Sequence, residues 1–178
     1  MKLEVDAAAQ AQIDRVRKHL PSGNDLTLVA LKGHLLVEEA LDDIIAIGCF
    51  QPEHLEKLEI PFRVKPALAR ALFGHILWPG IWPLVEALNT IRNVLAHNLD
   101  SPKLKDRTIR FLKVRCEQAP LLNDPPLDPN DSSAVAERFR SDVSLLLGQL
   151  TGGAILIRTL AKQAQPAVSE DASQAVPR

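Results

Sequence analysis

Breaks rich in proline and glycine divide this chain into segments with helical periodicity, and signals of β-strands are almost missing. The sequence has no Asn-Gly or Asp-Gly hairpin and no sustained alternation of apolar and polar residues. Periodicity and breakers together predict helices over Glu4–Leu20, Leu26–Ile47, Pro52–Leu58, Phe62–Gly74, Leu84–His97, Lys103–Arg115 and Ser133–Lys162. We therefore expect an all-α fold.

The size of the chain favours a single domain. With 178 residues, 46% of them hydrophobic and 24% charged, it can bury one sizeable core and cannot be disordered throughout. We expect a domain over residues 1–162, with its centre at about 22–115. An extra N-terminal helix precedes this centre. A proline-rich loop over 119–130 and a C-terminal helix over about 133–162 follow it, and the tail 163–178 is expected to be disordered.

Several classes of protein are excluded by simple counts. The chain has two cysteines, Cys49 and Cys116, without Cys-x-x-Cys spacing, so neither a disulfide scaffold nor a metal site is predicted, and no cofactor is implied. No segment is predicted to span a membrane, and the N-terminus lacks the apolar core of a signal peptide. We expect a cytoplasmic protein.

Charge is unevenly distributed, although the net charge is only −1. Residues 21–60 carry two basic residues against eight acidic ones, whereas residues 101–115 carry six basic residues against one acidic residue. The basic segment predicts a track for RNA phosphates, formed by Lys103, Lys105, Arg107, Arg110 and Lys113. Two other interpretations stay open: a partner for the acidic segment, or a solvated helix face.

The segment 84–98 is the most informative part of the sequence. Leu84, Leu88, Ile91 and Leu95 fall on one helical face, which predicts that this face packs inward. A second, polar seam holds Glu86, Thr90, Asn93 and His97. Arg92 lies five residues before His97, roughly 140° around an ideal helix. The two side chains can meet only if the helix ends or bends near Ala96, or if two chains build the site.

The run from Arg92 to His97 resembles the R-x4–6-H signature of the HEPN superfamily, in its R-N-x-x-x-H form. The helices expected at Leu26–Ile47 and Phe62–Phe73 precede the motif in the matching order. The resemblance covers roughly residues 20–115 and implies a HEPN-like helical bundle. HEPN domains are commonly dimers, and active members are metal-independent RNA endonucleases. A homodimer in which Arg92 and His97 of two subunits share one cleft is therefore implied.

The chemistry implied by this resemblance needs no metal. A ribose 2′-OH attacks the adjacent phosphorus, His97 accepts or donates the proton, and Arg92 holds two non-bridging oxygens. Asn93 supports the site by orienting the phosphate or the His97 ring. The expected products carry a 2′,3′-cyclic phosphate and a 5′-hydroxyl. The resemblance therefore suggests a toxin or effector of a bacterial toxin–antitoxin or defence system. The expected substrate is RNA, and an antitoxin protein is a further expected partner.

Structural interpretations of the motif stay open. Arg92 can pair with Glu86 or with a carbonyl at the helix C-terminus, and His97 can cap that terminus, where a cation interacts favourably with the helix dipole. The functional alternative is a catalytically silent HEPN-like regulator that acts by dimerisation and partner binding, similar to mannitol-operon-repressor-type proteins.

A further polar pair lies on the long helix over Leu26–Ile47. His34 falls on its apolar face, with Glu38 one turn later at the edge, so the two side chains can bond each other. Glu38 is thus a candidate catalytic residue that tunes a histidine beside the cleft. The alternative is a histidine that packs, with its hydrogen bonds satisfied, at a helix interface.

Overall fold

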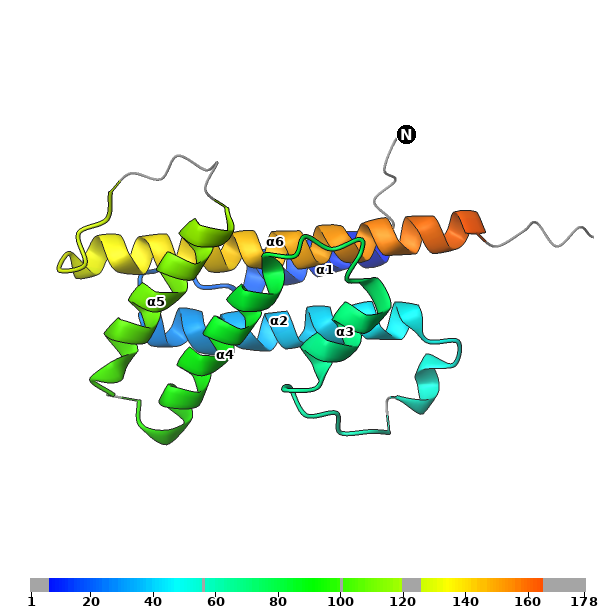
Figure 1. Ribbon diagram of the computed structural model, residues 1–178, viewed down its shortest axis with the longest axis horizontal. Helices are drawn as coiled ribbons and strands as arrows, with labels where there is room; N and C mark the ends of the chain where they lie inside the picture. The colour runs from blue at the N-terminus through cyan, green and yellow to red at the C-terminus, as the bar shows by residue number, and fades with distance from the viewer. Residues whose placement is uncertain (1–6, 56, 100, 120–125, 165–178) are drawn as a thin grey trace, which may run out of the picture.

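The computed structural model describes residues 7–55, 57–99, 101–119 and 126–164. Within these residues the protein has six α-helices, one short 3-10 helix and no strand, so the predicted all-α class is confirmed (Figure 1). Most of the tail that was expected to be disordered, and half of the proline-rich loop, lie outside the described residues. Gln163 and Ala164 belong to the last helix.

The helices follow the predicted segments closely. Their bounds are α1 Ala7–His19, α2 Leu26–Gly48, η1 Pro52–His54, α3 Lys65–Phe73, α4 Ile81–His97, α5 Lys103–Gln118 and α6 Ser132–Ala164. Asp25 caps α2 by accepting a hydrogen bond from the Leu28 amide at 2.9 Å. Asp131 caps α6 in the same way, accepting from the amides of Ser133 and Ala134 at 3.0 Å.

Several boundaries differ from the prediction, among them the end of α5, which lies at Gln118 rather than Arg115. Helix α4 begins at Ile81 rather than Leu84, because Pro83 sits in the first turn, where a missing amide hydrogen costs no helical bond. Helix α3 begins at Lys65 rather than Phe62, since residues 61–65 form turns in which the Val64 amide donates to the Pro61 carbonyl. Only residues 52–54 of the predicted segment 52–58 are helical.

The helices form two layers. Helices α1, α2 and α6 run side by side along the long axis, and α3, α4 and α5 cross them on one side (Figure 1). The core lies between the layers, and its largest buried side chains include Phe111 of α5 and Phe139 of α6, whose rings meet edge to face at 5.2 Å. In the crossing layer α4 lies between α3 and α5, so it has one neighbouring helix on each side (Figure 1).

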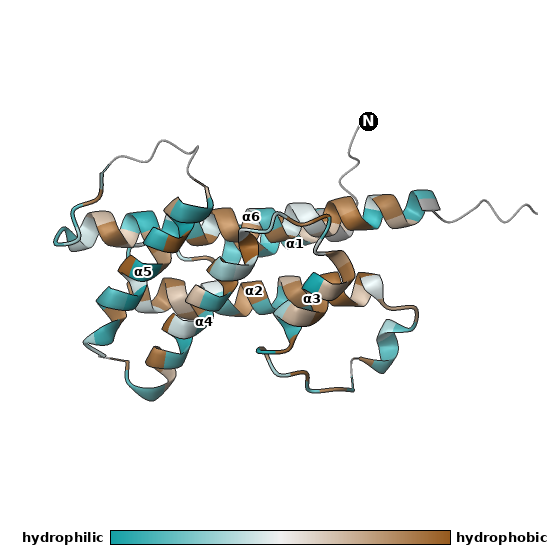
Figure 2. Cartoon of the chain, viewed as in Figure 1, coloured by the Kyte–Doolittle hydropathy of each residue, from teal (hydrophilic) through white to brown (hydrophobic). Residues whose placement is uncertain are grey.

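Helix α6 is long and apolar enough to cross a membrane by length and composition alone, with a mean hydropathy of 1.5 in its most apolar window. The sequence patterns had not singled it out. Core helices of soluble proteins pass the same test, and one side of α6 packs on α2 and α5 through residues such as Phe139, Leu146 and Leu150. Apolar and polar residues alternate around this helix (Figure 2).

Candidate functional site

Helix α4 separates core residues from the motif. Its buried face holds the four predicted residues together with Ile81, Trp82 and Val85, so the predicted inward face is confirmed. The side chains of Arg92, Asn93 and His97 are all exposed. The helix continues without a bend to His97, and the Asn98 amide closes its last turn by donating to the Val94 carbonyl at 3.1 Å.

This geometry decides how Arg92 and His97 can meet. Because the helix is regular between them, the two side chains leave it in directions roughly 140° apart. One chain therefore does not bring them together. Among the described residues no carboxylate forms an ion pair with Arg92, so the suggested pairing with Glu86 does not form. His97 lies in the last turn of α4, where a capping role is also compatible with its position.

His34 is buried between α2 and α4. Its Nε2 lies 3.2 Å from Oδ1 of Asn89, and its ring packs on Phe62 with centroids 4.1 Å apart. Burial lowers the pKa of His34, and the charge of Arg92 acts in the same direction, so the ring is neutral at pH 7. These contacts support the packing interpretation of His34. Arg92 also lies near enough to His34 for its positive charge to disfavour protonation of the ring.

Glu38 has a different partner from the predicted one. Its Oε1 accepts from Nζ of Lys65 at 2.8 Å, and the same ammonium donates to Oδ2 of Asp42 at 2.7 Å. The predicted hydrogen bond between His34 and Glu38 is therefore wrong: the edge of α2 that carries Glu38 faces α3, whereas His34 faces α4. Since Glu38 is engaged in this contact, we leave it out of the proposed catalytic residues.

The basic side chains of α5 lie beside the polar seam of α4. Lys103, Lys105, Arg110 and Lys113 are exposed and Arg107 is half-buried. A groove of about 310 Å³ runs between the two helices, and its lining residues are Pro83, Glu86, Ala87, Thr90, Arg107, Arg110 and Val114. Hydrophilic residues cover most of α5 (Figure 2). Two residues of the predicted phosphate track, Arg107 and Arg110, and two residues of the polar seam, Glu86 and Thr90, thus line the same groove.

The acidic segment is not the partner of this basic row. Glu39 bonds Arg15 of α1 at 2.6 Å, and Asp43 bonds Arg158 of α6 at 2.7 Å. Glu38 and Asp42 share Lys65. None of the five basic α5 residues forms an ion pair in the part of the chain that the structure describes. Of the three interpretations of the basic segment, pairing with the acids of residues 21–60 is not found for any acid that the structure describes.

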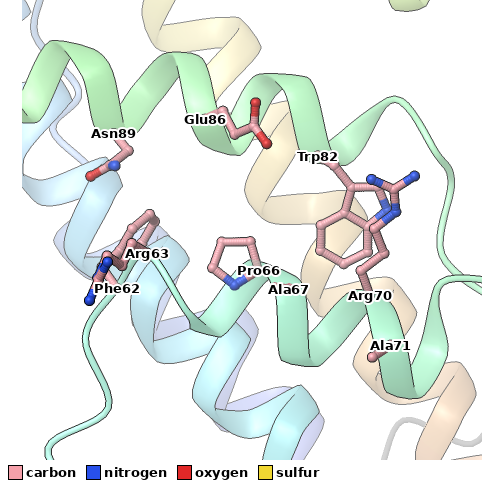
Figure 3. Close-up of a pocket in the computed structure, with 9 residues that line it drawn as sticks. All are labelled: Phe62, Arg63, Pro66, Ala67, Arg70, Ala71, Trp82, Glu86 and Asn89. Atoms are coloured by element: carbon pink, nitrogen blue, oxygen red, sulfur yellow. The ribbon is translucent and has the colours of Figure 1, made fainter.

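A second groove, on the other side of α4, was missed from the sequence. Figure 3 shows this pocket of about 490 Å³ between α3 and α4. It is lined by Phe62, Arg63, Pro66, Ala67, Arg70, Ala71, Trp82, Glu86 and Asn89. The signal in the sequence was the spacing of Arg63 and Arg70, which are seven residues apart and would share one side of the helix predicted over Phe62–Gly74. In the structure Arg63 lies in the turn before α3.

Among the described residues no group of three or more His, Cys, Asp or Glu side chains is placed to hold a metal ion. Compared with known proteins, the chain matches no family model, no curated protein and no solved structure.

Proposed function

We propose that the protein is a HEPN-type, metal-independent RNA endonuclease whose active site forms between two subunits. One observation carries the proposal. Arg92, Asn93 and His97 are exposed on a helix whose opposite face supplies the core, so their side chains are free to act on a ligand.

The two catalytic residues have distinct roles in this proposal. His97 removes the proton from the ribose 2′-OH as it attacks phosphorus, or protonates the leaving 5′-oxygen. Arg92 places its guanidinium fork on two non-bridging oxygens and stabilises the charge of the transition state. Asn93 orients the phosphate. The reaction breaks the P–O5′ bond and leaves a 2′,3′-cyclic phosphate and a 5′-hydroxyl.

The homodimer follows from the helical geometry. With Arg92 and His97 directed about 140° apart in one chain, a symmetric pair of α4 helices can bring Arg92 of each subunit to His97 of the other. A stable interface of this kind buries about 1,000 Å² or more in total. The biological setting we propose is that of a toxin or effector in a bacterial defence or toxin–antitoxin system, acting on cytoplasmic RNA and held in check by an antitoxin protein.

Mixing two inactive variants tests both the chemistry and the dimer. His97→Ala and Arg92→Ala should each lower cleavage of a labelled single-stranded RNA by about 100-fold or more. After the two homodimers are unfolded and refolded together, half of the dimers are mixed and carry one intact site of two. Activity should return to about a quarter of the wild-type value.

The control for this experiment is His75→Ala, which removes another exposed histidine and should leave cleavage unchanged. Full activity in His97→Ala, or a protein that sediments as a monomer at micromolar concentration, would refute the proposal. A wild-type dimer that never cleaves RNA would instead favour the silent regulator, for which the terminal position of His97 on α4 is sufficient.

A further inference from the structure

The pocket between α3 and α4 is lined by three charged side chains. None of the three forms an ion pair within the described part of the chain. Arg63 and Arg70 come from the α3 side, and Glu86 comes from α4. Side chains of opposite charge around one pocket would normally pair with each other. Since they do not, the pocket offers two donors and one acceptor to a ligand.

The pocket has a polar wall and an apolar floor. Pro66 and Ala67 of α3 form the floor, and Glu86 and Asn89 project from α4 on the opposite side (Figure 3). Residues 86 and 89 are three apart, about 4.5 Å along the helix axis, so both reach one edge of a small planar ligand. The floor suits the apolar face of such a ligand, and the wall suits a hydrogen-bonding edge.

The hydrogen-bonding capacity of this wall is specific. The Asn89 oxygen already faces Nε2 of buried His34 at 3.2 Å, which leaves the Asn89 amide hydrogens to donate into the pocket. The Glu86 carboxylate only accepts when ionised. The wall therefore complements a ligand edge with one acceptor, which faces the Asn89 amide, followed by two adjacent N–H donors, which face the Glu86 carboxylate. Among the four RNA bases only guanine has this edge, formed by O6, N1–H and the N2 amino group.

The two arginines line the pocket from opposite ends of the α3 side: Arg63 follows Phe62 in the turn before α3, and Arg70 lies in the last turn of α3 (Figure 3). The helical stretch between them, Lys65 to Arg70, rises about 7.5 Å along the axis of α3. A base inside a strand carries a phosphate on each side, which matches a guanidinium at each end. A free nucleotide carries its phosphates on one side and would leave one of the two arginines unused.

We propose that this pocket binds one unpaired guanine of the RNA substrate, with Glu86 and Asn89 on its Watson–Crick edge and with Arg63 and Arg70 on the flanking phosphates. The inference rests on the proposed function for its substrate class. It adds a sequence preference that the motif residues do not provide, because Arg92 and His97 act on the phosphate and sugar alone.

Binding to a cleavage-deficient protein tests the pocket separately from catalysis. Full-length His97→Ala is titrated calorimetrically with the trinucleotides UGU, UAU, UCU and UUU and with guanosine monophosphate. We expect UGU to bind about 10- to 100-fold more tightly than the other three, the effect of one or two hydrogen bonds to a charged group. Guanosine monophosphate should bind more weakly than UGU, since it lacks one flanking phosphate.

Three variants in the same background assign the contacts. Glu86→Gln should abolish the preference for UGU, because it replaces one acceptor oxygen with a donor. The double variant Arg63→Ala/Arg70→Ala should weaken all four trinucleotides and keep their order. The matched control Arg107→Ala/Arg110→Ala, in the other groove of α4, should leave the ratio between UGU and UAU unchanged. All these residues reach solvent, and melting temperatures verify that each variant folds.

Each contrary result has a defined meaning. Equal affinity for the four trinucleotides, or a preference for UGU that survives Glu86→Gln, overturns the guanine site. If guanosine monophosphate binds as tightly as UGU, the claim that the guanine belongs to an RNA strand is refuted. The pocket is then assigned to a free guanine nucleotide. If the wild-type protein fails to cleave RNA while the preference for UGU holds, the endonuclease is refuted and the guanine site stands.

Discussion

Lys65 joins α2 to α3 and offers a quantitative test of the packing that forms the pocket floor. Its ammonium donates to Glu38 at 2.8 Å and to Asp42 at 2.7 Å, while only 9% of its side chain is exposed. The perturbation we choose is Lys65→Met, which keeps an unbranched stem of similar length and removes the charge. It deletes both hydrogen bonds without creating a large cavity.

The expected loss follows from the exposure of each partner. The Glu38 side chain is 29% exposed, so its charge-assisted bond contributes about 1.5 kcal/mol. The Asp42 side chain is 50% exposed, and its bond contributes less than about 1 kcal/mol because water screens it. Methionine also avoids the desolvation cost of the ammonium, which offsets part of this loss. We expect Lys65→Met to lower the free energy of unfolding by about 1–2 kcal/mol at pH 7.

The pH dependence adds an independent check. Burial alone would lower the pKa of Lys65, but the hydrogen bonds and charges of Asp42 and Glu38 outweigh it and raise the pKa above its usual 10.5. A lysine whose folded pKa is raised contributes stability that is fully present below the unfolded pKa and is lost as pH rises through the folded pKa. The difference between wild type and Lys65→Met should therefore be constant from pH 6 to about 10 and shrink above that range.

Urea denaturation followed by circular dichroism measures these differences. Lys32→Met is the matched control: Lys32 is an exposed lysine on α2 that forms no ion pair within the described residues, and its substitution should change stability by less than about 0.5 kcal/mol. A Lys65→Met protein as stable as wild type at pH 7, or a difference that persists undiminished at about pH 12, would refute this reasoning.

Two further predictions concern the core and the α5 groove. Burial raises the pKa of Asp142 to about 6 from 3.8 and outweighs the opposing charge and hydrogen bond of Arg138, while Nε of Arg115 lies 3.0 Å from Oδ1 of the same carboxyl group. The stability that this raised pKa contributes is fully present below pH 3.8 and is lost as pH rises through about 6. Relative to Asp142→Asn, wild type should gain about 2–3 kcal/mol of unfolding free energy between pH 7.5 and pH 4, measured in urea; parallel pH curves would contradict this. Arg107→Ala/Arg110→Ala should flatten the salt dependence of RNA binding by roughly 0.7 per lost contact and leave cleavage at saturating RNA unchanged. If the salt dependence of RNA binding does not change, the basic residues of α5 form only a solvated helix face.

The positions of the helices were predictable because their signals are local. Asp25 and Asp131 stand directly before α2 and α6 in the sequence and cap them, since an N-cap acts on amides two or three residues away. The inward face of α4 followed from periodicity alone. The start of α4 was missed because a proline inside the first turn, Pro83, is compatible with several helix starts.

The contacts between helices were not predictable by the same means. His34 bonds Asn89, which is 55 residues away, rather than Glu38 on the next turn of its own helix. Local spacing makes the Glu38 contact possible, but the docking of α3 brings Lys65 to Glu38 and so removes it. The pocket between α3 and α4 was missed for the same reason: Arg63 and Glu86 belong to separate segments, and only tertiary packing places them around one space.

The separation of roles on α4 makes the proposed chemistry testable without loss of the fold. Ile91 and Leu95 are buried among the core residues, and Arg92, Asn93 and His97 alternate with them on the exposed side. Truncating an exposed residue of this kind removes no core contact and typically changes stability by less than about 0.5 kcal/mol. A loss of cleavage in Arg92→Ala or His97→Ala therefore reports on the reaction itself. If either substitution unfolded the protein, the structural interpretations of Arg92 and His97 would be favoured over the catalytic one.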